Sequence, residues 1–427
     1  MKVFKSKVFF SLFLILLCFV SCTETAKIAN RNLAYSFAKE AQILHPHYQV
    51  YHSSANKSQL HFSINTSELL YMKSPGSGNY FAKVSISYLL YASFESKQVL
   101  DSTTVFLEDD ASREENASLH GFIEFSQSYP NRSVMEITIM DLNRNQSSVS
   151  YVEVDKSNQN TYQNFLLSDV NSTQLFGNHF KCNDTVALMY DKNSAQKKLR
   201  VRYFKPEVSL PSPPFSIQNV RSTQLRPDSV SYLELNKNYK GLMHFSKEGI
   251  YFVQSDTASQ EGLTLLVFYD DFPLLIDPLK LIPPIRYVTT KQEFDVLSFS
   301  TNKKLSLDKF WLTNAGSVEK AKSVLKVFYN RVQNANTYFT SYTEGWRTDR
   351  GLIYIAFGLP SSVYRDSNGE TWTYLETQNN RPLQFSFSKV DNIFSDNNFL
   401  LNRTENYRND WFRIIDAWRQ GKINHEN

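Results

Sequence analysis

The feature that most constrains the fold of this chain is the alternation of apolar and polar residues in short runs. The runs Ala82–Tyr88, Val134–Ile139 and Ser148–Val154 alternate with a period of two, and polar clusters such as Ser74–Gly78 separate them. Because successive side chains of a strand point to opposite faces, this period predicts strands with one buried face. Aromatic residues make up 14% of the chain and favour the same structure, since they pack well on a pleated surface.

Two consecutive sets of such runs predict two β-sandwiches. The first set occupies residues 46–156 and the second residues 157–272. Residues 273–305 contain several prolines and predict a packed connector. The pattern changes again in residues 306–427, which contain all five tryptophans of the chain.

Residues 306–427 predict helices at both ends and strands between them. Apolar positions from Ala321 to Phe339 step by three or four residues, and those from Tyr407 to Trp418 do the same, which predicts two amphipathic helices. The wholly apolar run Leu352–Phe357 predicts a central strand covered on both faces, followed by strands near Trp372 and Phe385. The predicted fold is therefore mainly β with a C-terminal α+β domain, in which a small antiparallel sheet packs against two helices.

The first residues predict an export signal over residues 1–21. Three lysines precede the apolar run Val8–Val20, which is too short for a membrane span but of normal length for a signal peptide. The end of this segment, Ser21 followed by Cys22, resembles a bacterial lipobox, which implies a lipid on Cys22. The alternative is cleavage near Ser21 without a lipid.

Residues 22–45 predict a polar tether with a short helix-like stretch over residues 32–43. Cys18 would leave with the signal and Cys22 would carry lipid, so Cys182 is alone and no disulfide is expected. His179 and Cys182 are too few ligands to predict a metal site.

Net charge and motif content exclude several classes of function. Lys plus Arg total 46 and Asp plus Glu total 42, and loss of the three lysines in residues 1–21 leaves 43 against 42. A body so close to neutral is not expected to bind nucleic acid. Residues 306–427 contain no Cys and only one His, His425, so no Ser–His or Cys–His arrangement is possible there. We expect no catalytic residue, cofactor or metal.

One segment carries a family resemblance. Gly345-Trp346-Arg347-Thr348-Asp349, with the downstream Gly358, is similar to the signature of the GWxTD-domain proteins, which are mostly uncharacterised envelope lipoproteins of the Bacteroidetes lineage. Leu359 departs from the family, which usually has proline there. The resemblance implies an envelope location and this architecture, but no settled activity.

The motif residues Trp346, Arg347, Thr348, Asp349 and Arg350 are the candidate interaction residues, and three interpretations of them remain open. In the structural one, the glycine permits a left-handed turn, the tryptophan fills a helix–sheet seam, and Thr348 and Asp349 bond nearby backbone amides. The two arginines then pair with Asp349 or Glu344, or bond the last carbonyls of the preceding helix. In the second, the tryptophan and arginines form a ledge that binds a carboxylate or a sugar. In the third, Glu344 or Asp349 acts as a catalytic acid or base.

Four short segments resemble the O-glycosylation acceptor of exported Bacteroidetes proteins, with Ser102, Thr185, Ser229 and Thr257 as the acceptors. Taken together, the sequence predicts a non-catalytic outer-membrane lipoprotein, anchored at Cys22 and facing the periplasm, that acts as a scaffold in envelope assembly or in a secretion-linked complex. Its expected partners are the membrane and an envelope protein, with peptidoglycan or another glycan as a further possibility. The alternative is an enzyme or carbohydrate-binding protein that acts on cell-wall or glycan substrates.

Overall fold

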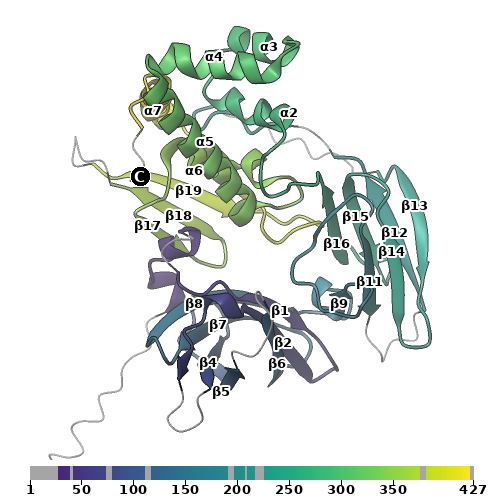
Figure 1. Ribbon diagram of the computed structural model, residues 1–427. Coiled ribbons are helices and arrows are strands. Elements are labelled where there is room, and N and C mark those ends of the chain that lie inside the picture. The colour runs from purple at the N-terminus through teal and green to yellow at the C-terminus, as the bar shows by residue number, and fades with distance from the viewer. Residues whose placement is uncertain are drawn as a thin grey trace, which may run out of the picture.

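The computed structural model describes residues 27–38, 42–73, 79–110, 117–190, 197–206, 209–216, 226–375 and 381–423. The predicted signal peptide and Cys22 therefore lie outside the described residues. No helix of the described part is long and apolar enough to cross a membrane. The described residues form two β-sandwiches and a C-terminal α+β domain, as the alternation predicted (Figure 1).

The first sandwich, called sandwich 1, consists of two facing antiparallel sheets. One sheet has the order β1-β2-β6, with strands His47–Tyr51, Lys57–Asn65 and Ser118–Ser126. The other has the order β3-β4-β7-β8 with β5 beside β4, and its strands are Met72–Lys73, Tyr80–Tyr91, Asn131–Asp141, Gln146–Lys156 and Val99–Asp110. Leu60 of the first sheet and Ile86 and Ile137 of the second are fully buried in one core. The period-two pattern thus places its apolar face between the sheets.

Sandwich 2 repeats this arrangement with different strand pairing. One sheet has the order β14-β11-β9, with strands Lys240–His244, Thr185–Tyr190 and Phe165–Ser168. The other has the order β10-β16-β15-β12-β13, with strands His179–Lys181, Leu263–Phe268, Gly249–Gln254, Lys198–Phe204 and Ser229–Glu234. The pair β10–β16 is parallel and the remaining pairs are antiparallel. Leu188, Leu199 and Leu265 are fully buried where the two sheets meet.

The C-terminal domain, taken here as residues 273–423, surrounds the long helix α5 (Val318–Phe339). The N-cap of α5 is Ser317, and its side chain accepts a hydrogen bond from the Lys320 amide. The sheet has the order β17-β18-β19-β20, with strands Ser362–Arg365, Gly369–Tyr374, Leu383–Lys389 and Phe399–Leu401. The other helices are α2 (Pro278–Leu281), α3 (Lys291–Phe299), α4 (Lys303–Ala315), α6 (Asp349–Phe357) and α7 (Arg408–Arg419).

The central strand predicted over Leu352–Phe357 is wrong, because this segment is the greater part of helix α6. Every residue from Asp349 to Ala356 is buried. A helix that is buried on all sides has no polar face, so its sequence shows no period of 3.6 residues. A short apolar run of this kind cannot be told from a buried strand by periodicity alone.

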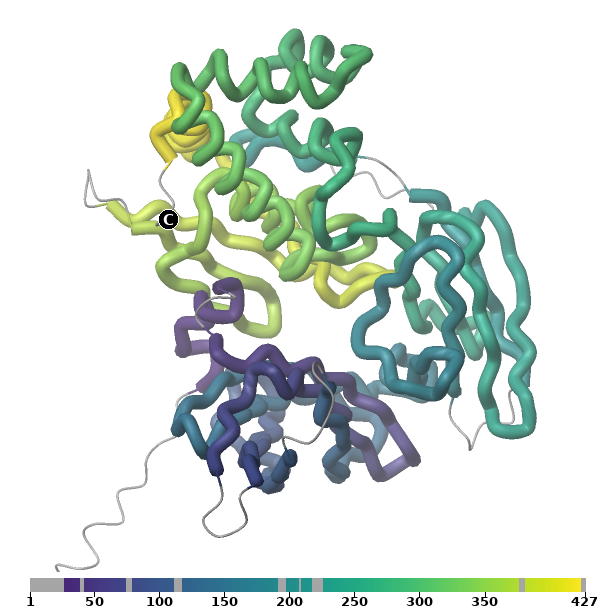
Figure 2. The backbone as a smooth tube through the Cα atoms, in the orientation of Figure 1, coloured from purple at the N-terminus to yellow at the C-terminus, as the bar shows by residue number. Residues whose placement is uncertain are grey.

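Two segments predicted as links pack into the body of the protein. The connector 273–305 contributes Leu275, Ile282 and Ile285 to the same core as α5. Residues 27–38 of the predicted tether form two short 3-10 turns, Ile28–Asn30 and Ala34–Phe37, in place of the single helix-like stretch expected. Figure 2 shows this N-terminal segment between sandwich 1 and the C-terminal domain.

Candidate functional site

The GWxTD motif begins with a turn pressed against α5. A Cβ atom on Gly345 would lie 1.8 Å from the carbonyl oxygen of Ala335, and one on Gly351 would lie 2.0 Å from the carbonyl oxygen of Gly345. Real Cβ atoms do not approach backbone so closely, so both positions require glycine. The left-handed turn predicted at Gly345 is wrong, because Gly345 is not among the glycines with a positive φ, and close packing against the helix sets the requirement for glycine.

Trp346 lies inside the C-terminal domain, where only 2% of it is exposed. Its amide donates to the side-chain oxygen of Asn336, and its carbonyl accepts from the hydroxyl of Tyr287. The guanidinium of Arg347 lies 4.2 Å from the centre of the indole ring and pairs with Glu344 at 2.7 Å. Trp346 therefore presents no free ring face for stacking on a ligand, which favours the structural interpretation of this residue.

Thr348 and Asp349 start helix α6, and Asp349 also connects it to backbone far along the chain. The hydroxyl of Thr348 donates to the Gly345 carbonyl and accepts from the Gly351 amide, which makes Thr348 the N-cap. The carboxylate of Asp349 accepts from the Leu401 amide at 2.7 Å and from the guanidinium of Arg403 at 2.9 Å.

The contact between Asp349 and Arg403 extends to sandwich 2. Arg403 also donates to the carbonyl of Ser212 at 3.1 Å. Ser212 lies in the proline-containing segment between β12 and β13. Asp349 thus orients a side chain that binds the second sandwich.

Arg350 is a buried cation with several partners. Only 2% of its side chain is exposed, and it donates to Glu370 at 3.0 Å and to the carbonyl of Asn397 at 3.1 Å. The ring of Phe399 lies 4.1 Å from the guanidinium. Burial lowers the pKa of Arg350 from its ordinary value, and the charge of Glu370 opposes this change. The second carboxylate oxygen of Glu370 accepts from the indole nitrogen of Trp372.

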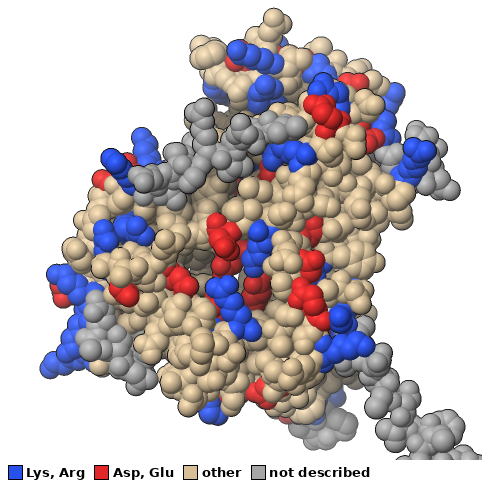
Figure 3. Space-filling model, turned by 180° about the vertical axis from the view of Figure 1, so that it is seen from behind, with Lys and Arg blue, Asp and Glu red and all other residues tan. Residues whose placement is uncertain are grey.

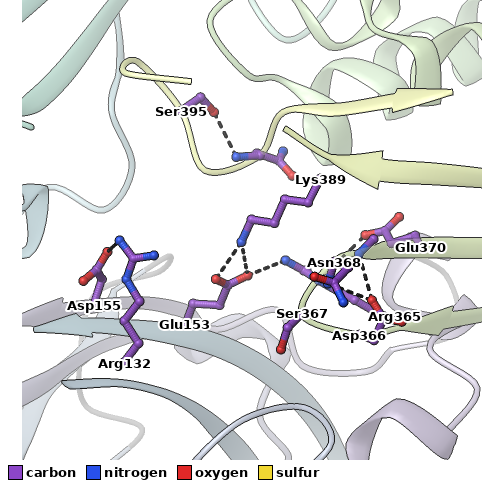
Figure 4. A network of polar contacts seen from close by, with 12 residues as sticks. Arg132, Glu153, Asp155, Arg365, Asp366, Ser367, Asn368, Glu370, Lys389 and Ser395 are labelled. Carbon is purple, nitrogen blue, oxygen red and sulfur yellow. Dashed lines mark hydrogen bonds and ion pairs between the residues drawn. The ribbon is translucent and has the colours of Figure 1, made fainter. Parts of the chain in front are cut away.

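Glu370, the partner of Arg350, is also close to an arginine that contacts sandwich 1. Arg365 lies 3.9 Å from Glu370 and also pairs with Glu153 of strand β8 at 2.6 Å. Lys389 of β19 pairs with the same Glu153 at 2.8 Å (Figure 4). A path of charged contacts therefore runs from Arg350 in the motif, through the hairpin β17–β18, to the first sandwich.

The N-terminal segment strengthens the junction with sandwich 1. Arg31 pairs with Glu136 of β7 at 2.7 Å, and the side-chain oxygen of Asn32 accepts from the Val363 amide. Phe37 packs against Phe339, with 5.0 Å between ring centres. The segment thus contacts both units that it separates.

The junction with sandwich 2 is mainly aromatic. Phe394 packs edge-on against Phe204 and Phe252, with ring centres 4.9 Å and 5.5 Å away. Phe215 lies 5.4 Å from Phe412 of α7. The sequence reasoning did not identify Glu153, Phe394 or the other junction residues, because contacts between units leave no local pattern.

Three acids in and near the motif are each paired with an arginine. Glu344 pairs with Arg347, Asp349 with Arg403, and Glu370 with Arg350. Figure 3 shows acidic and basic side chains side by side in the middle of the face opposite to that of Figure 1. Within the described residues, no group of His, Cys, Asp and Glu side chains is arranged to hold a metal ion.

The four predicted acceptor residues lie at the surface to different extents. Ser102 in β5, Ser229 in β13 and Thr257 after β15 are exposed. Thr185 is only partly exposed, and its hydroxyl bonds to a ring nitrogen of His244.

Comparison with known proteins identifies one domain. Residues 249–420 match the family model described as the GWxTD domain, so the resemblance predicted from Gly345–Asp349 is confirmed. No curated protein matches the chain. Among solved structures, the crystal structure of red sea bream transglutaminase is similar over 54% of this chain, with 9% identity and a TM-score of 0.19. The match covers 32% of the transglutaminase chain, and a likeness this low says nothing about activity.

Proposed function

We propose that this chain, which contains a GWxTD domain, is a non-catalytic scaffold of the cell envelope that is attached to the outer membrane by a lipid on Cys22. The observation that carries the proposal is the position of the motif between the three units. Asp349 orients Arg403 toward sandwich 2, and Arg350 leads through Glu370 and Arg365 to sandwich 1. A protein built in this way presents two sandwiches in a fixed relation, which suits a spacer with binding surfaces on both.

The burial and ion pairing of the acids near the motif favour a scaffold function rather than an enzymatic one. A glycosidase needs two carboxyl groups that face a substrate across a cleft. Asp349 and Glu370 are at least 95% buried, and each is paired with an arginine. A carboxylate in that setting is held as a structural anion and is not available to a substrate.

The proposed scaffold faces the periplasm and binds an envelope protein through surfaces of the sandwiches. The exposed hydroxyls of Ser102, Ser229 and Thr257 would be accessible to a glycosyltransferase before or after the protein docks. We include modification of at least one of these residues in the proposal. Peptide mapping of the protein from its native host tests this point directly.

The experiment that tests the proposed function is chemical crosslinking in intact cells, followed by mass spectrometry of what co-purifies. We expect reproducible links from lysines of both sandwiches to a single envelope protein. The matched control is Cys22→Ser, which removes the lipid acceptor without touching the described fold and should release the protein from the membrane fraction. Recovery of glycan or muropeptide with no stoichiometric protein partner would contradict the scaffold proposal.

A further inference from the structure

Strand β13 is a sheet edge with an unusual degree of exposure. It is the last strand in the five-stranded sheet of sandwich 2 and lies at the outer boundary of the molecule in Figure 1. Val230 and Tyr232 are 43% and 58% exposed, and among the residues of β13 only Leu233 is partly covered. Within the described chain, no strand pairs with the outer edge of β13.

The register of β13 shows which backbone groups face this edge. Leu235 donates its amide to the Lys197 carbonyl, and the strand pairing sets Leu233 opposite Leu199 and Ser231 opposite Val201. In an antiparallel pair, bonded residues alternate with residues whose N–H and C=O point away from the partner strand. The backbone groups of Val230, Tyr232 and Glu234 therefore point outward.

Several other edge strands of the described residues have features that block pairing. Strand β5 carries the acids Asp101, Glu108, Asp109 and Asp110, and strands β10 and β20 have only three residues each. The edge of β17 is bonded by the N-terminal segment, since Leu33 donates to the Val363 carbonyl. Charge, shortness and cover are the usual protections of an edge. Strand β13 has a single charge, Glu234, which pairs with Lys198 at 3.1 Å.

The sequence of β13 fits a copy of itself in antiparallel pairing. The outward-facing residues pair when Tyr232 lies opposite Tyr232 of the second copy, which sets Val230 opposite Glu234. Beyond them Asp228 lies opposite Asn236, and the amides of these two residues donate within the chain to the carbonyls of Tyr203 and Lys240. This register places an aromatic pair on the two-fold axis, an arrangement that stabilises antiparallel sheets. The neighbouring register, with Val230 opposite Tyr232, is disfavoured because it sets Asp228 opposite Glu234.

We propose that β13 pairs with β13 of a second copy of this chain, which joins two five-stranded sheets into one continuous sheet across a two-fold axis. The inference rests on the edge geometry alone and is independent of the proposed scaffold function. An interface of two short strands is smaller than that of a stable dimer, so we expect a dissociation constant in the micromolar range. Attachment to a membrane would raise the local concentration and favour the pair.

The test is sedimentation velocity on the purified full-length chain and two variants over a concentration series. Tyr232→Pro removes an outward N–H without removing a bond to β12, since proline is tolerated at a sheet edge with this orientation. It should weaken the dimer at least tenfold, because two hydrogen bonds at the axis are lost. The matched control Tyr232→Thr keeps the N–H and should weaken the dimer less.

Circular dichroism and thermal unfolding of both variants should match wild type, which separates loss of pairing from loss of folding. A wild-type chain that stays monomeric up to high micromolar concentration would overturn the proposal. A dimer that is equally strong in Tyr232→Pro would also overturn it. Stoichiometric co-purification of an extended peptide on β13 would overturn it in favour of a different occupant of the same edge.

Discussion

The two junctions of the C-terminal domain differ in chemistry. The junction with sandwich 1 is formed mainly by charged groups, with Glu153 held by Arg365 and Lys389. The junction with sandwich 2 centres on Phe394, which inserts between aromatic rings of the sheet. The first resists separation through ion pairs that salt can screen, and the second through apolar burial that salt does not weaken.

This difference indicates how the GWxTD motif works in the structure. The motif contributes Arg350 to the path toward the charged junction and Asp349 to the contact with the second sandwich. Its tryptophan and glycines hold the turn that positions both residues. The motif is therefore the part that both junctions share, whereas each junction residue affects one side only.

The largest expected loss of stability comes from a substitution in the GWxTD motif, which both junctions share. Gly345→Ala would place a methyl group 1.8 Å from the Ala335 carbonyl, so the turn must lift away from α5. We expect a loss of about 4 kcal/mol or more in the free energy of unfolding, as for severe overpacking of a core. Urea unfolding followed by tryptophan fluorescence measures it.

The matched control for Gly345→Ala is Gly316→Ala. Gly316 has a positive φ of 76° but open space around its Cβ position. Its substitution should cost only about 1 kcal/mol, from backbone strain. Equal losses in the two variants would contradict the role that we give to close packing at Gly345.

The second largest expected loss of stability tests the aromatic junction with sandwich 2 alone. Phe394→Ala removes a ring that is only 5% exposed, so we expect a loss of about 3 kcal/mol. The loss should be the same in low and high salt, because no ion pair is involved. Phe299→Ala serves as the control, since Phe299 is 85% exposed and its loss should stay within about 0.5 kcal/mol. A salt-dependent loss in Phe394→Ala would contradict the comparison.

The sequence predicted the sandwiches better than it predicted the interior of the C-terminal domain. In a strand with one buried face every second residue is buried, and β4 follows this pattern closely, whereas β7 and β8 follow it only toward their C-terminal ends. Helix α6 is buried on all sides, so the same reasoning mistook it for a strand. Local patterns reveal an element only when one face of it remains polar.

The candidate site was predicted in part. The motif stood out by its residues, and its structural interpretation included a local pairing of Arg347 with Glu344. The partners of Asp349 and Arg350, by contrast, lie far along the chain at Arg403 and Glu370. Nothing in the sequence near the motif indicates these partners, because only the packing of the domain brings them together. The same holds for Glu153, which is an ordinary outward-facing residue of a strand until the hairpin β17–β18 covers it.

The third expected loss of stability tests the charged junction with sandwich 1 alone. Glu153→Gln removes the charge that pairs with Arg365 and Lys389, and all three side chains are partly buried. We expect a loss of about 1–2 kcal/mol at low salt that shrinks as salt rises, because screening weakens the wild-type contact. The control Glu108→Gln removes an exposed ion pair with Lys83 and should cost less than about 0.5 kcal/mol. A loss that is independent of salt would show that the junction is not held by charge.

The smallest expected loss of stability tests an ion pair within the C-terminal domain. This pair serves as a reference for the ion pairs of Glu153, which connect two units. Glu293 at the start of α3 pairs with Arg419 of α7, and this partner lowers the pKa of Glu293 from 4.5 to about 2. A lowered carboxyl pKa stabilises the fold above pH 4.5, and the contribution disappears as the pH falls from 4.5 toward 2.

Because about a third of the Glu293 side chain is exposed, solvent screening limits this contribution to about 1 kcal/mol. Wild type should therefore exceed Glu293→Gln in unfolding free energy at pH 7, and the difference should shrink below pH 4.5 and vanish only as the pH falls through about 2. The difference between wild type and Phe394→Ala should stay constant over the same range, since that variant removes no titrating group. A constant difference for Glu293→Gln would show that the ionised carboxylate of Glu293 adds nothing to the stability of the domain.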